Sequence, residues 1–303
     1  MAKMKFLWRS SKPLFHTMPP KYKLAIALLG GLYLAACSIL WFKQRSMIFH
    51  PMPARTPAEG SVMLREGSSQ FWLTKARPPA DSTPAVCSPG PAGRSAAAYF
   101  GGNAEPASAF GSKAAELPGC DLYALDYPGF EGAPGSPSEE SIHAAADAMM
   151  ARMARDGVDL SRSILIGRSL GSGEAVRQAS LLPCNMAILA TPYDSLTSVA
   201  IDHAPWAPVS LLIRDPFPAV SWAAHARCPA LVFYADFDQT IPPVHAQSLA
   251  DAWSPAQGSR LVTVEGITHS NIMDSKGVWT TVRSTLAAYQ AKMLAHAPNS
   301  SAR

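Results

Sequence analysis

The chain has 303 residues, of which 48% are hydrophobic and 16% are charged, with 27 prolines and a formal net charge of +4. The prolines separate apolar segments instead of clustering with polar residues, so the composition excludes extended disorder and favours one large domain with an appendage. Eight of the 26 basic residues lie at or before Arg45, so the chain from Ser46 onward carries 18 basic against 22 acidic residues. This balance gives no sign of a nucleic-acid partner.

An uncharged apolar run, LAIALLGGLYLAACSILWF, extends from Leu24 to Phe42. Its roughly 19 residues, at about 1.5 Å each in a helix, nearly match a hydrocarbon core of about 30 Å and predict a transmembrane signal anchor. A buried core helix fits less well, because no polar face interrupts the run and basic residues flank both ends. Six Lys or Arg residues precede the run and fewer follow it closely, which predicts a cytoplasmic N-terminus and an exported domain after Phe42.

The tetrapeptide LAAC, Leu34–Cys37, leaves a second interpretation open. In that interpretation the segment is a bacterial lipoprotein signal, and Cys37 becomes a lipidated N-terminus. The apolar run continues past Cys37 through Phe42, which favours the uncleaved anchor. Both interpretations tether the same domain to a membrane and expose it on the same side.

Eight short apolar runs follow the anchor and predict strands at 61–66, 69–76, 95–100, 120–127, 163–167, 186–191, 230–236 and 260–265. The later runs are continuously apolar, as in a parallel sheet covered on both faces, and segments long enough for crossover helices separate them. We therefore expect the α/β class, with a mostly parallel, doubly wound sheet of about eight strands and antiparallel strands at its start.

The predicted organisation of the chain is a basic cytoplasmic segment over 1–23, the anchor over 24–42, a linker over 43–60, the folded domain over 61–292 and a C-terminal tail over 293–303.

One helix start is well marked, at SPSEES. There Ser136 is expected to cap the helix, Pro137 to occupy its first position and Glu139 to complete a capping box. The apolar pattern carries this helix to about Arg155.

The stretch GRSLG, Gly167–Gly171, follows one of these strands and precedes a segment in which Ala175 and Val176 begin a helical pattern. Ligands bind at the carboxyl ends of strands in doubly wound sheets, and Ser169 lies at such an end. The glycines leave room for a sharp turn that presents the serine hydroxyl, so Ser169 is the predicted nucleophile. The G-x-S-x-G motif alone is weak evidence, and its strand-to-helix context carries the prediction.

A serine needs a base to take its proton and an acid to orient that base. Asp238 follows the strand at 230–236 and His269 follows the strand at 260–265, in the order Ser, Asp, His that alpha/beta hydrolases use. Asp236 is the alternative acid, but it ends its strand and is expected to cap the turn. We therefore predict Asp238 as the acid and His269 as the base.

Two backbone donors are needed for the oxyanion that forms during acyl transfer. The first is the N–H of Leu170, which follows the nucleophile at the positive end of a helix. The second is expected from the loop GGNAEP, Gly101–Pro106, after the strand at 95–100. Asn103 is the predicted donor in this loop and Gly102 is the alternative.

Together these stretches resemble the alpha/beta hydrolase family, and within it small membrane-anchored members that read F-H-G-N-A after the third strand and D-Y-x-G-x-G-x-S-x-G-x-P-S after the fourth. The matching stretches are YFGGNAE, DYPGFEGAPGSPSEES, GRSLGSG, DQTIPP and GITHSN, with KQRSMIFHP before the first strand. The resemblance extends from about Met47 to the last helix. The chain departs from the pattern at Gly101, where histidine is usual, and at Glu131, where the glycine spacing is altered.

The resemblance implies a serine hydrolase that cleaves an ester or thioester of a lipid, an acylated protein or a small molecule through an acyl-enzyme, without a cofactor or a metal. A serine peptidase with the same triad and a non-catalytic membrane-tethered domain remain alternatives. A short cap is expected over about 194–226. Its large apolar residues are Trp206, Leu211, Leu212, Phe217 and Trp222. They either pack the cap onto the sheet or line an acyl pocket.

Export would allow disulfides among Cys87, Cys120, Cys184 and Cys228, although four separate thiols remain an alternative. Cys184 and Cys228 each lie two residues before a predicted strand. Those strands should be parallel neighbours about 4.8 Å apart, and a disulfide tolerates α-carbons about 4.4 to 6.8 Å apart. We therefore expect a Cys184–Cys228 bridge that closes a loop around the cap.

Overall fold

The computed structural model describes residues 18–53, 61–66, 69–77, 87 and 95–295, and the chain divides into two compact units at 1–44 and 45–303. The first unit contains most of helix α2 (Pro20–Ile48). Among the described helices, α2 is the one whose length and composition suit a membrane span. Its large apolar side chains are exposed, including Leu24, Leu28, Leu29, Leu32, Leu34 and Phe42.

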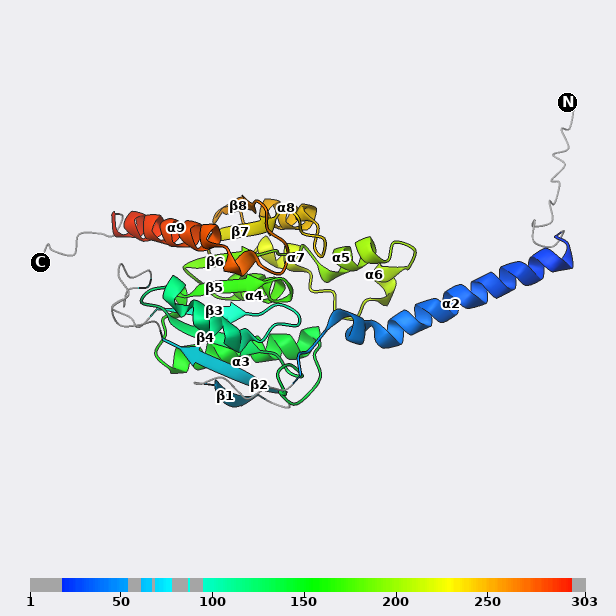
Figure 1. The fold of residues 1–303 in the computed structure, drawn as a ribbon, viewed down its shortest axis with the longest axis horizontal. Helices are drawn as coiled ribbons and strands as arrows, with labels where there is room; N and C mark the ends of the chain where they lie inside the picture. Colours follow the sequence, from blue (N-terminus) through cyan, green and yellow to red (C-terminus); the bar gives the residue numbers. More distant parts are fainter. Residues whose placement is uncertain (1–17, 54–60, 67–68, 78–86, 88–94, 296–303) are drawn as a thin grey trace, which may run out of the picture. The chain divides into compact units, whose positions relative to one another are not determined.

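The second unit is built on a sheet of eight described strands in the order β1-β2-β4-β3-β5-β6-β7-β8 (Figure 1). Their bounds are β1 (Ser61–Glu66), β2 (Ser69–Ala76), β3 (Ala96–Phe100), β4 (Asp121–Asp126), β5 (Ile164–Arg168), β6 (Met186–Ala190), β7 (Ala230–Ala235) and β8 (Ser259–Val264). β2 pairs antiparallel with β1 and with β4, whereas the neighbours from β4 to β8 pair in parallel. The predicted strands and the predicted mixed topology are confirmed.

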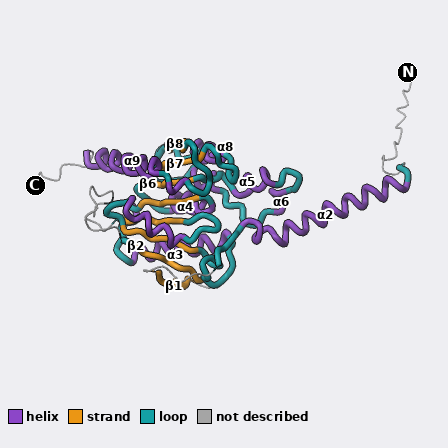
Figure 2. The backbone as a smooth tube through the Cα atoms, viewed as in Figure 1, coloured by secondary structure: helices purple, strands orange, loops and turns teal. Residues whose placement is uncertain are grey.

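Helices cover both faces of this sheet, and Figure 2 shows them beside the orange strands. One face packs against α3 (Glu139–Arg155), α4 (Leu170–Leu181), α7 (Ala219–Ala223) and α8 (Pro243–Asp251). The other packs against the 3-10 helices η1 (Ala107–Glu116) and η3 (Ile272–Asp274) and against α9 (Lys276–Ala295). In β3, Ala98 and Phe100 face the first layer and Tyr99 faces the second. Burial on both sides explains why this strand is apolar throughout.

The start of α3 differs from the sequence prediction, because the cap is Ser138 and not Ser136. The Ser138 hydroxyl accepts from the backbone N–H of Ser141 at 3.1 Å, and the Ser141 hydroxyl accepts from the N–H of Ser138 at 2.9 Å. Pro137 therefore precedes the cap and does not open the helix. Glu139 becomes the first helical residue, and Oε2 of its carboxylate accepts the backbone N–H of Phe217 outside the helix.

The cap expected over about 194–226 contains α5 (Leu196–His203), α6 (Val209–Leu212) and α7. Phe217 is fully buried in the core, and Trp222 packs partly buried against the same core. Leu211 is 81% exposed and Trp206 is 54% exposed. The packing interpretation therefore holds for Phe217 and Trp222, whereas Leu211 and Trp206 direct apolar surface outward.

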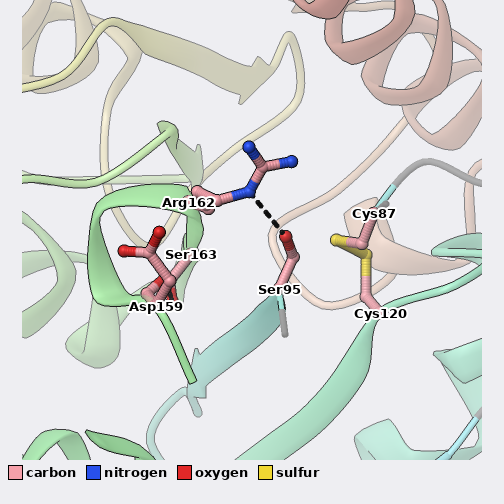
Figure 3. The surroundings of a disulfide bond; sticks show 6 residues. All are labelled: Cys87, Ser95, Cys120, Asp159, Arg162 and Ser163. Atoms are coloured by element: carbon pink, nitrogen blue, oxygen red, sulfur yellow. Dashed lines mark hydrogen bonds between the residues drawn. A yellow bond between two sulfur atoms is a disulfide. The ribbon is translucent and has the colours of Figure 1, made fainter. Parts of the chain in front are cut away.

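Two disulfides are present among the described residues. Cys184 and Cys228 are joined with their α-carbons 5.4 Å apart, as the sequence predicts, and the bridge encloses the cap. Cys87 and Cys120 form the second bridge; the sequence analysis allowed a disulfide at these cysteines without predicting their pairing. Figure 3 shows it beside Ser95, at the amino ends of β3 and β4, which is the edge of the sheet opposite Ser169. The second bridge is therefore remote from the predicted site.

Candidate active site

Three predicted site residues meet at the carboxyl edge of the sheet. Ser169 follows β5, Asp238 lies in the loop after β7, and His269 lies in the loop after β8. Nδ1 of His269 lies 2.8 Å from Oδ2 of Asp238, and Nε2 of His269 lies 2.8 Å from Oγ of Ser169. Parallel strands place these loops at one edge, and the side chains form a continuous hydrogen-bonded chain.

The turn at Ser169 is sharp and strained. Its φ of 49° and ψ of −118° lie in a region that a residue with a side chain rarely adopts. Helix α4 begins at the next residue, Leu170, and not near Ala175 as the sequence suggested. A β-carbon added at Gly167 would lie 2.6 Å from the carbonyl oxygen of Gly171, so close packing of strand and helix requires glycine at position 167. The backbone therefore holds the Ser169 hydroxyl at the tip of a rigid corner.

The two aspartates after β7 have different contacts. Asp238 is buried, and its Oδ1 accepts the backbone N–H groups of Thr240 at 2.9 Å and Ile241 at 2.8 Å, which leaves Oδ2 for His269. Asp236 accepts the backbone N–H groups of Gly266 and Ile267 and so holds the turn after β8. The structure thus places Asp238 against the imidazole and gives Asp236 a turn-stabilising position.

The loop after β3 lies directly beside Ser169. A β-carbon added at Gly102 would lie 3.5 Å from Cβ of Ser169. The N–H of Gly102 already donates to Oε2 of Glu105 at 2.8 Å, so it does not suit the role of oxyanion donor. Within the described residues, the N–H groups of Asn103 and Leu170 have no acceptor. Of the two donors considered in this loop, Asn103 is the one with a free N–H.

The same loop has glycine at position 101, where the resembling family pattern has histidine. A β-carbon at Gly101 would lie 3.3 Å from Cβ of Ala107, so a side chain there would require a small shift of Ala107. The Tyr127 hydroxyl donates to the carbonyl oxygen of Gly101 at 3.0 Å and holds the backbone from the other side. The loop is therefore fixed without a side chain at this position.

Sequence reasoning missed a partly buried ion pair in this site. Nη1 of Arg168 lies 2.5 Å from Oε2 of Glu105, and Nη2 of Arg168 donates to the carbonyl oxygens of His269 at 3.3 Å and Ser270 at 3.1 Å. Burial lowers the pKa of Arg168, but the carboxylate of Glu105 outweighs this effect and raises it. The available signal was a pair of opposite charges after β3 and at the end of β5, which are neighbouring strands.

Two further acids, Asp126 and Glu131, interact near the start of η1. Asp126 accepts the backbone N–H of Ala107 at 2.6 Å, and burial together with Glu131 raises the pKa of Asp126 to about 7. Glu131 is buried, has a φ of 48°, and its Oε1 has no hydrogen-bond partner among the described residues. In the described part of the chain, no group of three or more His, Cys, Asp or Glu residues is arranged to hold a metal ion.

The strand order, the corner at Ser169 and the position of the loops define an alpha/beta hydrolase fold. An esterase from Pyrococcus furiosus has a similar structure, with a TM-score of 0.57 at 12% identity over 80% of this chain and 98% of that protein. The fold is therefore that of the alpha/beta hydrolases, as the sequence predicts.

The sequence comparisons identify a narrower relationship. Uncharacterized protein MT2364 of Mycobacterium tuberculosis is 30% identical over 281 residues, which are 86% of this chain and 93% of that protein. The chain belongs to the same family as this mycobacterial protein. Alpha/beta hydrolase domain-containing protein 17C of Mus musculus is 29% identical over 154 residues, which are 50% of this chain and 46% of that protein. No family model matches the sequence.

Proposed function

We propose that the protein is a membrane-anchored serine hydrolase that cleaves carboxylic ester or thioester bonds through an acyl-enzyme. The observation that carries this proposal is the hydrogen-bonded chain from Asp238 through His269 to the strained Ser169. A structural serine in a turn does not need a buried aspartate and an imidazole aligned behind its hydroxyl. The free N–H groups of Asn103 and Leu170 beside it support the same conclusion.

In the proposed reaction, Oγ of Ser169 attacks the carbonyl carbon of the substrate while Nε2 of His269 takes the hydroxyl proton. Asp238 accepts a hydrogen bond from the Nδ1–H of the imidazole, which orients the ring and stabilises its protonated form. The oxyanion accepts hydrogen bonds from the backbone N–H groups of Asn103 and Leu170. His269 then protonates the leaving group, and a water molecule activated by the same imidazole hydrolyses the acyl-enzyme.

We also propose that α2 anchors the protein, with its N-terminus in the cytoplasm and the hydrolase unit exported. The exposed apolar side chains of α2 and the basic residues before it support this topology. A reporter that is active only outside the cytoplasm should function when it is fused to the C-terminus. Mass spectrometry of the mature protein distinguishes the anchor from the lipoprotein, because the lipoprotein would begin with an acylated Cys37.

An active-site label and a panel of acyl substrates test the hydrolase proposal. A fluorophosphonate should label the full chain, and Ser169→Ala should abolish labelling and lower turnover of a p-nitrophenyl ester by roughly 10⁴-fold or more. Ser180→Ala is the matched control, because Ser180 lies on the same helix and bonds only to the carbonyl of Arg177. Comparable turnover by the Ser169 variant would disprove the proposal, and cleavage of peptide amides in preference to esters would favour a peptidase.

A further inference from the structure

The side chain of Asn103 is held by the segment that connects α2 to the hydrolase unit. Its Nδ2 donates to the carbonyl oxygen of Ile48 at 2.5 Å and lies 3.0 Å from Nδ1 of His50. Its Oδ1 accepts the backbone N–H of His50 at 2.7 Å. Both ends of the amide are therefore bonded to residues more than 50 positions earlier in the chain.

This connecting segment is itself fixed to the hydrolase unit. Phe49 is 2% exposed and belongs to the core cluster that contains Phe100 at the end of β3. Arg45, one turn earlier, donates from Nε and Nη2 to the buried carboxylate of Asp215 at 2.8 and 3.0 Å. The residues that bond Asn103 thus have a defined position and can act as a support.

The oxyanion loop needs such a support. It contains Gly101 and Gly102, which restrict the backbone least of all residues, and Ala104 has a φ of 53°. An oxyanion donor must point at the developing charge, and a displacement of about 1 Å costs as much as 10²-fold in rate. Fixing the side-chain amide of Asn103 on both sides fixes the orientation of its backbone N–H.

We propose that the segment Ile48–His50 is part of the catalytic apparatus, because it positions the oxyanion donor of Asn103. This inference rests on the proposed hydrolase function. It makes the last residue of the apolar helix and the two residues after it a requirement for turnover as well as a tether. A mature protein beginning at Cys37 would retain this segment, so the requirement applies equally to the anchored and the lipidated forms.

Four variants of the full chain test this positioning role. Asn103→Ala removes all the side-chain contacts, whereas Asn103→Asp keeps the acceptor for His50 and loses the donor to Ile48. His50→Pro removes the backbone N–H that Asn103 accepts. Met47→Ala is the matched control, because Met47 directly precedes this segment and its side chain is exposed.

The readouts are kcat, KM and the inhibition constant of an alkyl trifluoromethyl ketone, whose adduct with the serine carries an oxyanion. We expect Asn103→Ala and His50→Pro to lower kcat by roughly 10- to 100-fold and to raise the inhibition constant of the ketone by a similar factor, with KM nearly unchanged. Asn103→Asp should also lower kcat, and Met47→Ala should match the wild type. Thermal unfolding verifies that each variant is folded.

A folded Asn103→Ala protein with wild-type kcat and ketone affinity would overturn the inference, as would a rise in KM alone. If His50→Pro does not fold, the two Asn103 variants decide the outcome. Retained turnover in Ser169→Ala would refute the hydrolase proposal itself. Loss of turnover in Ser169→Ala together with normal kinetics in the Asn103 variants would refute only the role of Ile48–His50.

Discussion

The stability of the hydrolase unit should fall between about pH 6 and pH 9 because of His143 on α3. Its Nδ1 lies 2.5 Å from Oε2 of the fully buried Glu174, and its Nε2 lies 3.4 Å from Oε1 of Glu139. Burial lowers the pKa of His143, but the bonds to Glu139 and Glu174 outweigh this effect and raise the pKa to about 9, even though Arg177 opposes them. The imidazole is therefore protonated in the folded state at neutral pH.

This cation connects three elements of the unit. Glu174 lies on α4, directly after the nucleophile corner, while Oε2 of Glu139 accepts the backbone N–H of Phe217 in the cap at 2.9 Å. Raising the pKa from its ordinary value near 6.5 to about 9 corresponds to about 3 kcal/mol of folding free energy. Because the folded state holds the proton more tightly, this contribution is complete below about pH 6.5 and is lost as the pH rises through about 9.

Urea unfolding of the full chain in detergent, at about pH 6 and about pH 9, measures this contribution. The free energy of unfolding of the wild type should fall by about 3 kcal/mol more than that of His143→Gln over this interval. His225→Gln, which removes an exposed histidine bonded to the carbonyl of Ser221, should behave like the wild type. If His143→Gln loses as much stability as the wild type between the two pH values, the assignment of the proton to this cluster is wrong.

Three further results are expected. Asp238→Asn should lower turnover by about 10³-fold or more while Asp236→Asn mainly lowers the melting temperature, and the opposite pattern in kinetics and thermal unfolding would exchange their roles. Glu131→Gly should stabilise the unit by about 1–2 kcal/mol in urea unfolding. Glycine adopts the left-handed backbone conformation of position 131 without strain, and the substitution removes a buried oxygen without a partner; a loss of stability would contradict this. Replacing Cys184 and Cys228 by serine should lower the free energy of unfolding by about 4 kcal/mol, because the bridge joins residues 44 positions apart, and the same urea unfolding measures this. Full alkylation of both residues in the native protein would show that no bridge forms.

The sheet could be predicted because burial leaves a direct mark on the sequence. Strands from β3 to β7 are covered on both faces, so each is a short continuous apolar run between turns. The start of α3 shows where such local rules stop. Ser136 and Ser138 flank Pro137, and both satisfy the composition of a cap, so only the actual hydrogen bonds with Ser141 distinguish them.

The positions of Ser169, Asp238 and His269 could also be predicted from the sequence. Each lies just after a strand, in the turn or loop at its carboxyl end, and these ends lie at the same edge of the sheet. The hydrogen bonds that hold the loops around these three residues could not be predicted from the sequence. The bond between Asn103 and His50 joins residues 53 positions apart, and that between Arg168 and Glu105 spans 63. Such polar contacts have no periodic pattern and depend on how loops cross after the sheet has formed.

The Arg168–Glu105 pair shows what these long-range contacts contribute. A partly buried ion pair such as this one adds little net stability, because desolvation of the two charges offsets much of their attraction. In the described part of the chain, Nε of Arg168 is moreover buried without a partner, which is a further cost. The planar guanidinium nevertheless bonds the oxyanion loop through Glu105 and the histidine loop through the carbonyl oxygen of His269, and it directly precedes Ser169. Its contribution is therefore geometric, since one rigid group links the loop that carries Glu105 and the loop that carries His269 to the corner at Ser169.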